Sequence, residues 1–99
     1  MICSVSPEAE QELIAGALHH ASEANTELAL AFIAEFERAL GVLCSYPRLG
    51  AVWRGTTRRF PLRRFPFSII YQVKPQEVRI VALAHQRREP GYWRDRATL

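Results

Sequence analysis

The sequence predicts one α+β domain in which a helical hairpin packs on a mostly antiparallel sheet, in the order β-α-α-β-β-β. The first observation is length, because 99 residues leave room for a single compact domain, spanning 1–99. The second is periodicity: apolar residues recur at helical spacing in the first half and alternate as in strands in the second. Helices and antiparallel strands segregated in this way define the α+β class.

The first elements are a short strand at residues 2–5 and a helix that begins after it. Ser6 is a capping residue, Pro7 suits the first helical position, and Glu8 favours the positive end of the helix. One helical stripe is predicted to be buried, and it comprises Ala9, Leu13, Ile14, Ala17, Leu18 and Ala21.

A second helix follows at once. Asn25 and Thr26 interrupt the first helix and cap the next, so the two helices form an antiparallel hairpin. Pro47 and Gly50 end the second helix. Its stronger apolar stripe comprises Leu28, Phe32, Phe36, Leu40 and Leu43.

Strand patterns occupy the rest of the chain, at residues 51–55, 58–65, 66–73 and 78–84. The third run alternates, with Phe67, Ile69, Tyr71 and Val73 expected on the buried face. A turn at 74–76 joins the last two strands into a hairpin. Pro61 and Pro66 belong at strand ends, because proline cannot donate to a ladder.

Composition indicates an ordinary globular protein, 48% hydrophobic and 23% charged. No stretch approaches the roughly 18 apolar residues of a membrane span, and the start lacks the features of a secretory signal. Cys3 and Cys44 lie far apart without metal-type spacing, so we expect two free thiols in a cytoplasmic protein.

Charge divides the chain into an acidic and a basic half. Residues 1–46 carry a balance of −6 and residues 47–99 one of +9, within a net charge of +3. Eleven of the twelve cations in the second half are arginine, which binds phosphate and carboxylate through a planar fork. This asymmetry predicts a basic surface suited to an acidic partner, either nucleic acid or an acidic protein segment.

The arginines of the first strands alternate with aromatic residues. Trp53, Phe60 and Phe65 are interspersed with them, and part of the cluster must face solvent. A solvated basic face is one interpretation, but both residue types are enriched in interfaces, so we favour a binding surface. Stacking of single-stranded RNA would require similar residues. The cluster comprises Arg54, Arg58, Arg59, Arg63 and Arg64.

The histidines give only weak indications of a metal site or of acid–base catalysis. His19 and His20 are consecutive on a helix and point about 100° apart, so we expect surface side chains and no metal site. His85 ends the last strand beside arginines, where it either orders the strand end or serves as an acid or base. Nucleophile elbows and glycine-rich phosphate loops are missing from the sequence, and no cofactor is expected.

Four segments together resemble the ParE branch of the RelE/ParE toxin superfamily: "SPEAEQEL", "YPRLG", "FPFSIIYQV" and "VALAHQRREPGYWRDR". The resemblance implies a cytoplasmic toxin of a type II toxin–antitoxin module, of the kind associated with plasmid stabilisation. Its antitoxin would resemble ParD, a ribbon-helix-helix dimer with an acidic C-terminal segment, and operator DNA would be bound only through that antitoxin. ParE-like toxins are linked to inhibition of DNA gyrase.

The RelE branch, which cleaves mRNA on the ribosome, is the alternative. The lone lysine, Lys74, lies in a turn, and arginine cannot act as a base, so cleavage would depend on His85, Arg87, Arg88 and Tyr92. We favour a gyrase inhibitor that is not an enzyme. A co-repressor with little toxicity of its own is a third hypothesis.

The sequence thus assigns two surfaces. The expected target-binding residues are Arg87, Arg88, Tyr92, Trp93 and Arg94, with Trp93 packed on the sheet more readily than exposed. The expected antitoxin-binding residues are Arg58, Arg59, Arg63 and Arg64, and an apolar stripe of the antitoxin would dock near the helical hairpin or a sheet edge.

Overall fold

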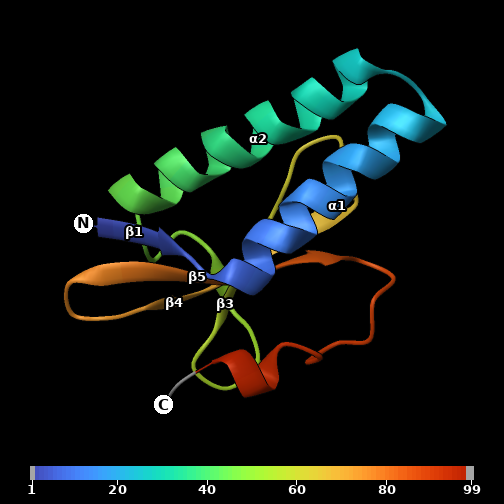
Figure 1. The fold of residues 1–99 in the computed structure, drawn as a ribbon. Coiled ribbons are helices and arrows are strands. Elements are labelled where there is room, and N and C mark those ends of the chain that lie inside the picture. The colour runs from blue at the N-terminus through green and yellow to red at the C-terminus, as the bar shows by residue number, and fades with distance from the viewer. Residues whose placement is uncertain (1, 98–99) are drawn as a thin grey trace.

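The computed structural model describes residues 2–97 and confirms the predicted α+β class, with four described strands rather than three after the two helices. Five strands form one sheet in the order β1-β5-β4-β3-β2, with β1 parallel to β5 and the other neighbours antiparallel. The helical hairpin covers one face, and the segment after β5 lies on the other (Figure 1). The elements are β1 (Ile2–Val5), α1 (Pro7–Glu23), α2 (Thr26–Ser45), β2 (Ala51–Val52), β3 (Arg58–Pro61), β4 (Phe67–Val73), β5 (Glu77–His85) and the short 3-10 helix η1 (Arg94–Arg96).

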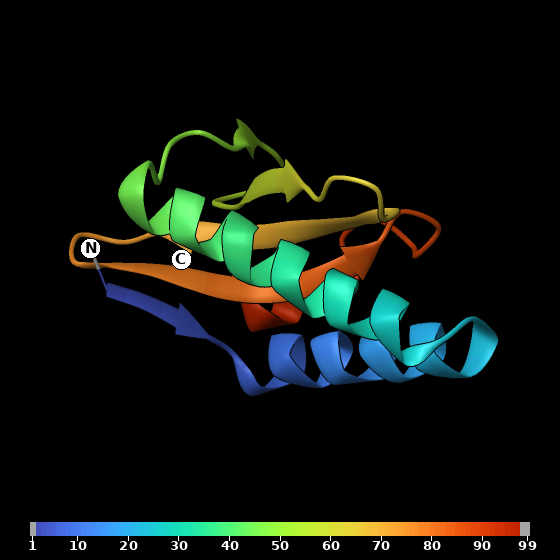
Figure 2. The ribbon, with the colours of Figure 1, turned by 90° about the horizontal axis from the view of Figure 1, so that it is seen from above.

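Both helices begin where their caps predict. The Ser6 hydroxyl accepts a hydrogen bond from the Ala9 N–H at 3.1 Å, and the Asn25 side chain accepts from the Leu28 N–H at 2.8 Å. These side chains satisfy backbone donors that have no partner within the helix. Seen from above, the two helices run side by side in opposite directions over the sheet (Figure 2).

The main core lies between the hairpin and the sheet, where Phe32, Phe36 and Leu43 of α2 pack in one cluster with Ile69 and Tyr71 of β4. The α2 stripe is therefore confirmed.

The α1 stripe is partly wrong. Leu18 is 65% exposed and Ile14 is also exposed, so the buried face of α1 is narrower than predicted. It is built on the small residues Ala9, Gly16 and Ala17. A Cβ atom at Gly16 would lie 2.7 Å from the Phe32 ring, so the helices approach too closely there for larger side chains.

A second, smaller core lies on the opposite face of the sheet. Ile70, Val81, Ala82 and Ala84 pack there with Trp93, which returns from the C-terminal segment. This covering explains why both faces of β4 are buried, where alternation predicted only one. Tyr71 pairs with Ile80 but Ile70 pairs with Ala82, so Val81 is an extra residue that forms a β-bulge.

The expectation of free thiols is wrong, because Cys3 and Cys44 form a disulfide with a Cα–Cα distance of 5.9 Å. β1 is an edge strand and α2 ends beside it, which brings together two residues separated by 41 positions. Sequence spacing alone does not reveal such an encounter.

Strand boundaries differ from the prediction mainly before β4. Only Ala51–Val52 and Arg58–Pro61 are strands, and the flanking residues form loops. Pro61 ends β3 and Pro66 precedes β4, as expected. Arg64 has a φ of 70°, a left-handed conformation that interrupts any extended run through 58–65.

Candidate functional site

The C-terminal segment folds back onto the sheet after β5. Gly91 has a φ of +84°, which a side chain would disfavour, and the turn there brings Trp93 onto the second core. Trp93 is only 4% exposed, which confirms the prediction that it packs on the sheet. Within the expected target-binding set, Trp93 is the residue that anchors the segment to the sheet.

The side chain that fixes this segment is Glu12 of α1. Glu12 Oε1 accepts hydrogen bonds from the Leu83 N–H at 3.1 Å and from the Arg96 guanidinium at 2.9 Å, and Oε2 accepts from the Tyr92 hydroxyl. Arg88 lies 3.9 Å from Oε2. A largely buried carboxylate is stable only when it is paired and hydrogen-bonded in this way.

Sequence reasoning missed Glu12, although one signal was present. Glu12 follows Ala9 by three positions and precedes Gly16 by four, which places it on the buried face of α1. A charged residue on an apolar helical face requires a partner. The partner is the part of β5 that follows Ile80, which is the last residue of β5 that pairs with β1.

Tyr92 is held protonated by its surroundings. Burial raises the pKa of its hydroxyl well above the ordinary value, and the hydrogen bond to Glu12 and the negative charge of Glu12 raise it further. Arg88 and Arg96 lie over the ring at 4.0 and 5.0 Å from its centroid, in cation–π contact.

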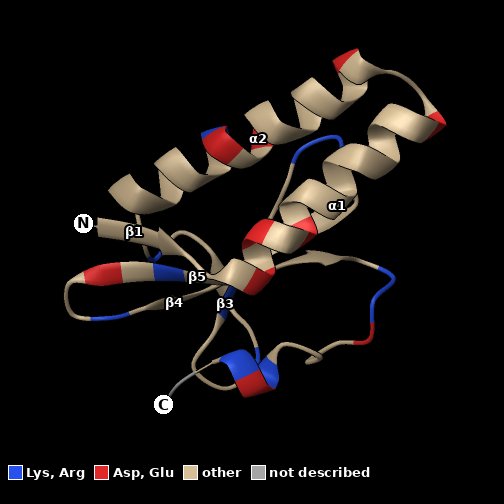
Figure 3. Cartoon of the chain, in the orientation of Figure 1, with Lys and Arg blue, Asp and Glu red and all other residues tan. Residues whose placement is uncertain are grey.

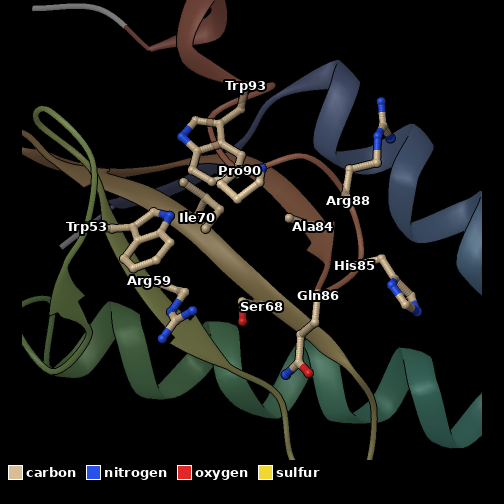
Figure 4. Close-up of a pocket in the computed structure, with 10 residues that line it drawn as sticks. All are labelled: Trp53, Arg59, Ser68, Ile70, Ala84, His85, Gln86, Arg88, Pro90 and Trp93. Atoms are coloured by element: carbon tan, nitrogen blue, oxygen red, sulfur yellow. The ribbon is translucent and has the colours of Figure 1, made fainter.

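The four residues expected to cleave RNA in the ribonuclease hypothesis do not converge on one cavity. The His85 ring packs edge-on against Phe67 at 4.9 Å, and its Nδ1 accepts the Arg87 N–H at 3.0 Å. Figure 4 shows the side chains of His85 and Arg88 pointing away from the space between Trp53 and Ser68. Tyr92 and Arg88 meet beside Glu12, where the Arg88 guanidinium lies 4.0 Å from the centroid of the Tyr92 ring, whereas the His85 ring packs on Phe67.

Three of the exposed residues in the C-terminal segment are arginine, and they lie among the acidic Glu89 and Asp95. Arg87, Arg88 and Arg94 are exposed, while Tyr92 is half-buried. Figure 3 shows acidic residues concentrated on the helices and basic residues on the loops and on the segment after β5. We call Arg87, Arg88 and Arg94 the tail arginines.

The four arginines expected to bind an antitoxin separate into three places. Arg58 donates to the Gly50 carbonyl at 2.8 Å and so supports the loop before β2. Arg59 points to the other face of the sheet and stacks on Trp53, 4.3 Å from the ring centroid. Arg63 and Arg64 are exposed in the loop between β3 and β4.

That loop is joined to α2 through Glu35. The Arg63 N–H donates to Glu35 Oε2 at 2.6 Å, and the same carboxylate pairs with Arg38 at 2.7 Å. Arg38 lowers the pKa of Glu35, so the carboxylate stays charged. The basic loop is therefore fixed along α2.

An apolar groove lies at the end of α2, lined by Val42, Tyr46, Pro47, Leu49 and Val73 among others. Tyr46 is 68% exposed, and Leu49 and the nearby Val52 of the edge strand β2 are also more than half exposed. Exposed apolar side chains gathered in this way indicate a contact surface for another protein.

His20 is not a surface residue, contrary to the prediction. Its ring lies among Phe32, Phe65 and Phe67, at centroid distances of 4.9, 5.2 and 6.3 Å, and its Nε2 is buried without a partner among the described residues. Burial lowers the pKa of His20, and the nearby His19 and His85 lower it further. His19 is exposed as expected.

A cavity of about 180 Å³ opens on the face of the sheet that carries Trp93. Its wall includes Trp53, Arg59, Ser68, Ala84 and Trp93 (Figure 4).

In the part of the chain that the structure describes, no three His, Cys, Asp or Glu side chains gather where they would hold a metal ion. None of the described helices is long and apolar enough to cross a bilayer.

Comparison with known proteins points to one family. The family model described as "ParE toxin of type II toxin-antitoxin system, parDE" matches residues 4–90. A solved structure described as "Chromosomal ParDE TA system from P. aeruginosa" contains a similar chain, with a TM-score of 0.78 and 24% identity over 86% of this chain and 95% of that one. No curated protein matches the sequence.

Proposed function

Because the chain belongs to the ParE toxin family of type II toxin–antitoxin systems, we propose that it is a toxin that inhibits DNA gyrase and thereby replication in the bacterial cytoplasm. The observation that carries this proposal is the exposed set of tail arginines on a segment that Glu12 and Trp93 fix to the domain. Arginines that are positioned in advance lose little entropy on binding, which favours a specific contact with an acidic partner.

The same geometry supports binding without catalysis. The Tyr92 hydroxyl is bound to Glu12 and its pKa is raised, which makes it a poor proton donor to a substrate. The His85 ring packs on Phe67, and its Nδ1 accepts the backbone N–H of Arg87. The proposed toxin therefore acts by occupying its target, whereas an mRNA endoribonuclease of the RelE type would need these groups to converge.

The antitoxin of this module is a ParD-like ribbon-helix-helix protein with an acidic C-terminal segment. Its acidic side chains pair with Arg63 and Arg64, which are exposed, and with Arg58 of β3. Its apolar stripe docks in the groove formed by Tyr46, Leu49 and their neighbours. Operator DNA is contacted by the antitoxin alone.

The experiment is induced expression in a bacterial host with and without the antitoxin. We expect DNA synthesis to stop while transcripts stay intact, and co-expression of the antitoxin to restore growth. Truncated transcripts at the onset of arrest would support the ribonuclease instead. Unimpaired growth on expression of the toxin alone would support a co-repressor.

A further inference from the structure

The cavity opposite the helices exists because two short side chains face each other across the central strands. Ser68 of β4 pairs with Ala84 of β5, while the next pair along the same face is Ile70 with Ala82. Trp53 and Trp93 wall the space that the short side chains leave open. The hollow therefore follows from the sequence of β4 and β5.

Hydrogen-bond donors collect around this hollow. Ser68 is 4% exposed and lines the cavity. The indole N–H of Trp53 is buried without a hydrogen-bond partner among the described residues. An unpaired buried donor is destabilising, and a bound acceptor would remove that penalty.

Arg59 adds a full positive charge at the same place. Its guanidinium stacks on Trp53, 4.3 Å from the ring centroid, and Gln86 stands at the rim (Figure 4). The stacked ring restricts the guanidinium and shields one of its faces from water. Among the described residues that line the cavity there is no Asp or Glu, so the site selects for a negative ligand.

The size of the cavity restricts the ligand to one small group. At about 180 Å³ it is below the roughly 300 Å³ at which sites for drug-sized molecules begin. The hydrogen-bond donors in the wall of the cavity belong to Trp53, Arg59 and Ser68. A phosphate group presents at least three acceptor oxygens in different directions, whereas a carboxylate presents two in one plane.

The surroundings are those of a polyanion site. Arg88 lines the rim, and the exposed Arg54 and Arg87 lie on the segments that flank Trp53 and His85. Exposed arginines near a phosphate site extend the attraction to further phosphates along a strand.

We propose that this cavity binds one phosphate group of a nucleotide or of single-stranded nucleic acid, with Arg59 as the charged contact and Ser68 as a neutral donor. The site lies on the opposite face of the sheet from α2 and its apolar groove, and among its described lining residues it shares Arg88 with the tail arginines.

Tryptophan fluorescence provides the assay, because the chain has two tryptophans and both line the cavity. The purified toxin is titrated with inorganic phosphate, with adenosine monophosphate and with a short single-stranded oligonucleotide. We expect saturable binding that weakens about tenfold or more in Arg59→Gln and less in Ser68→Ala. Arg48→Gln is the matched control, because it removes the same charge from an exposed residue of the α2–β2 loop.

The outcomes separate the sources of phosphate. Binding of all three probes, each dependent on Arg59, supports a nucleotide-sized site; binding of the oligonucleotide alone, with the same dependence, supports nucleic acid as the source. Should Arg59→Gln unfold, Ser68→Val narrows the cavity without changing charge and is expected to abolish binding.

Three results would overturn the proposal: no fluorescence response to any probe, equal weakening in Arg48→Gln, or Arg59-dependent binding of a glutamate-rich peptide while phosphate is inert. Gyrase inhibition and antitoxin binding are measured on the same variants, so a loss of either is distinguished from a loss of phosphate binding.

Discussion

Glu12, in the second turn of α1, accepts a hydrogen bond from the hydroxyl of Tyr92, which lies 80 positions later in the chain. The same carboxylate binds the backbone of β5 at Leu83 and the guanidinium of Arg96. One side chain therefore joins the first helix, a central strand and the segment that presents the tail arginines. The arrangement makes the position of that segment depend on Glu12.

Replacing Glu12 by alanine is expected to lower the free energy of unfolding by about 2–4 kcal/mol, because it leaves the Leu83 N–H and Arg96 without their acceptor. Urea denaturation measures the loss. Gln11→Ala, an exposed neighbour on α1, is the control and should change stability little. Equal losses in the two variants would contradict the role given to Glu12.

Alkaline pH is expected to destabilise the fold through Tyr92. Its pKa is raised in the folded protein, so above about pH 10 the unfolded chain loses its proton first and stability falls as pH rises further. Burial also raises the pKa of Tyr71, which adds to the effect. Tyr92→Phe should flatten the decline between pH 9 and 11 (about the range set by a free tyrosine), as followed by thermal unfolding. An unchanged slope would show that Tyr92 ionises freely.

Acidic pH is expected to lower the stability of the fold through His20. Because burial lowers its pKa, the unfolded chain gains a proton first as pH falls below about 6.5, and the stability present at higher pH is lost. His20→Phe keeps a ring among Phe32, Phe65 and Phe67 and removes the unpartnered Nε2. We expect this variant to be more stable by about 1 kcal/mol at neutral pH, with a larger gain at pH 5.5.

His19→Gln is the control for that experiment, because His19 is exposed on the same helix. Denaturant titrations of both variants across pH 5 to 8, about the window in which histidine titrates, give the comparison. A loss of stability in His20→Phe, or the same pH profile as the parent protein, would argue against a neutral buried His20.

Reduction of the Cys3–Cys44 disulfide is expected to lower the free energy of unfolding by about 2–4 kcal/mol, because the bond closes a loop spanning 41 positions and restricts the unfolded chain. Denaturation with and without dithiothreitol measures the difference. A variant with alanine at both positions should show the lower stability under either condition. If the reductant changes its stability as well, the effect does not come from this bond.

Much of the fold follows from local signals in the sequence. Ser6 and Asn25 place both helix starts, since capping depends only on a few neighbouring residues. The hairpin of β4 and β5 follows from alternation and the turn between them. A Pro-Gly pair at 90–91 is typical of a turn, and Trp93 packs back on the sheet after it.

The rest depends on contacts between distant parts of the chain. The pairing of Cys3 with Cys44 needs β1 and the end of α2 to meet, and nothing in the spacing states that they do. His20 is half-buried rather than exposed because loop residue Phe65 packs against its ring. Arg58 and Arg59 point to opposite faces once β3 joins the sheet. The C-terminal segment likewise needed Glu12, whose partners are all at the far end of the sequence.

The central claim is that the tail arginines bind gyrase, and purified gyrase tests it most directly. The measurement is the toxin concentration that halves supercoiling of a plasmid, for the parent protein and for a variant with Arg87, Arg88 and Arg94 all replaced by alanine. We expect the parent to inhibit, the antitoxin to reverse the inhibition, and the variant to need at least about tenfold more protein while remaining folded. Normal supercoiling in the presence of saturating folded toxin would contradict the claim.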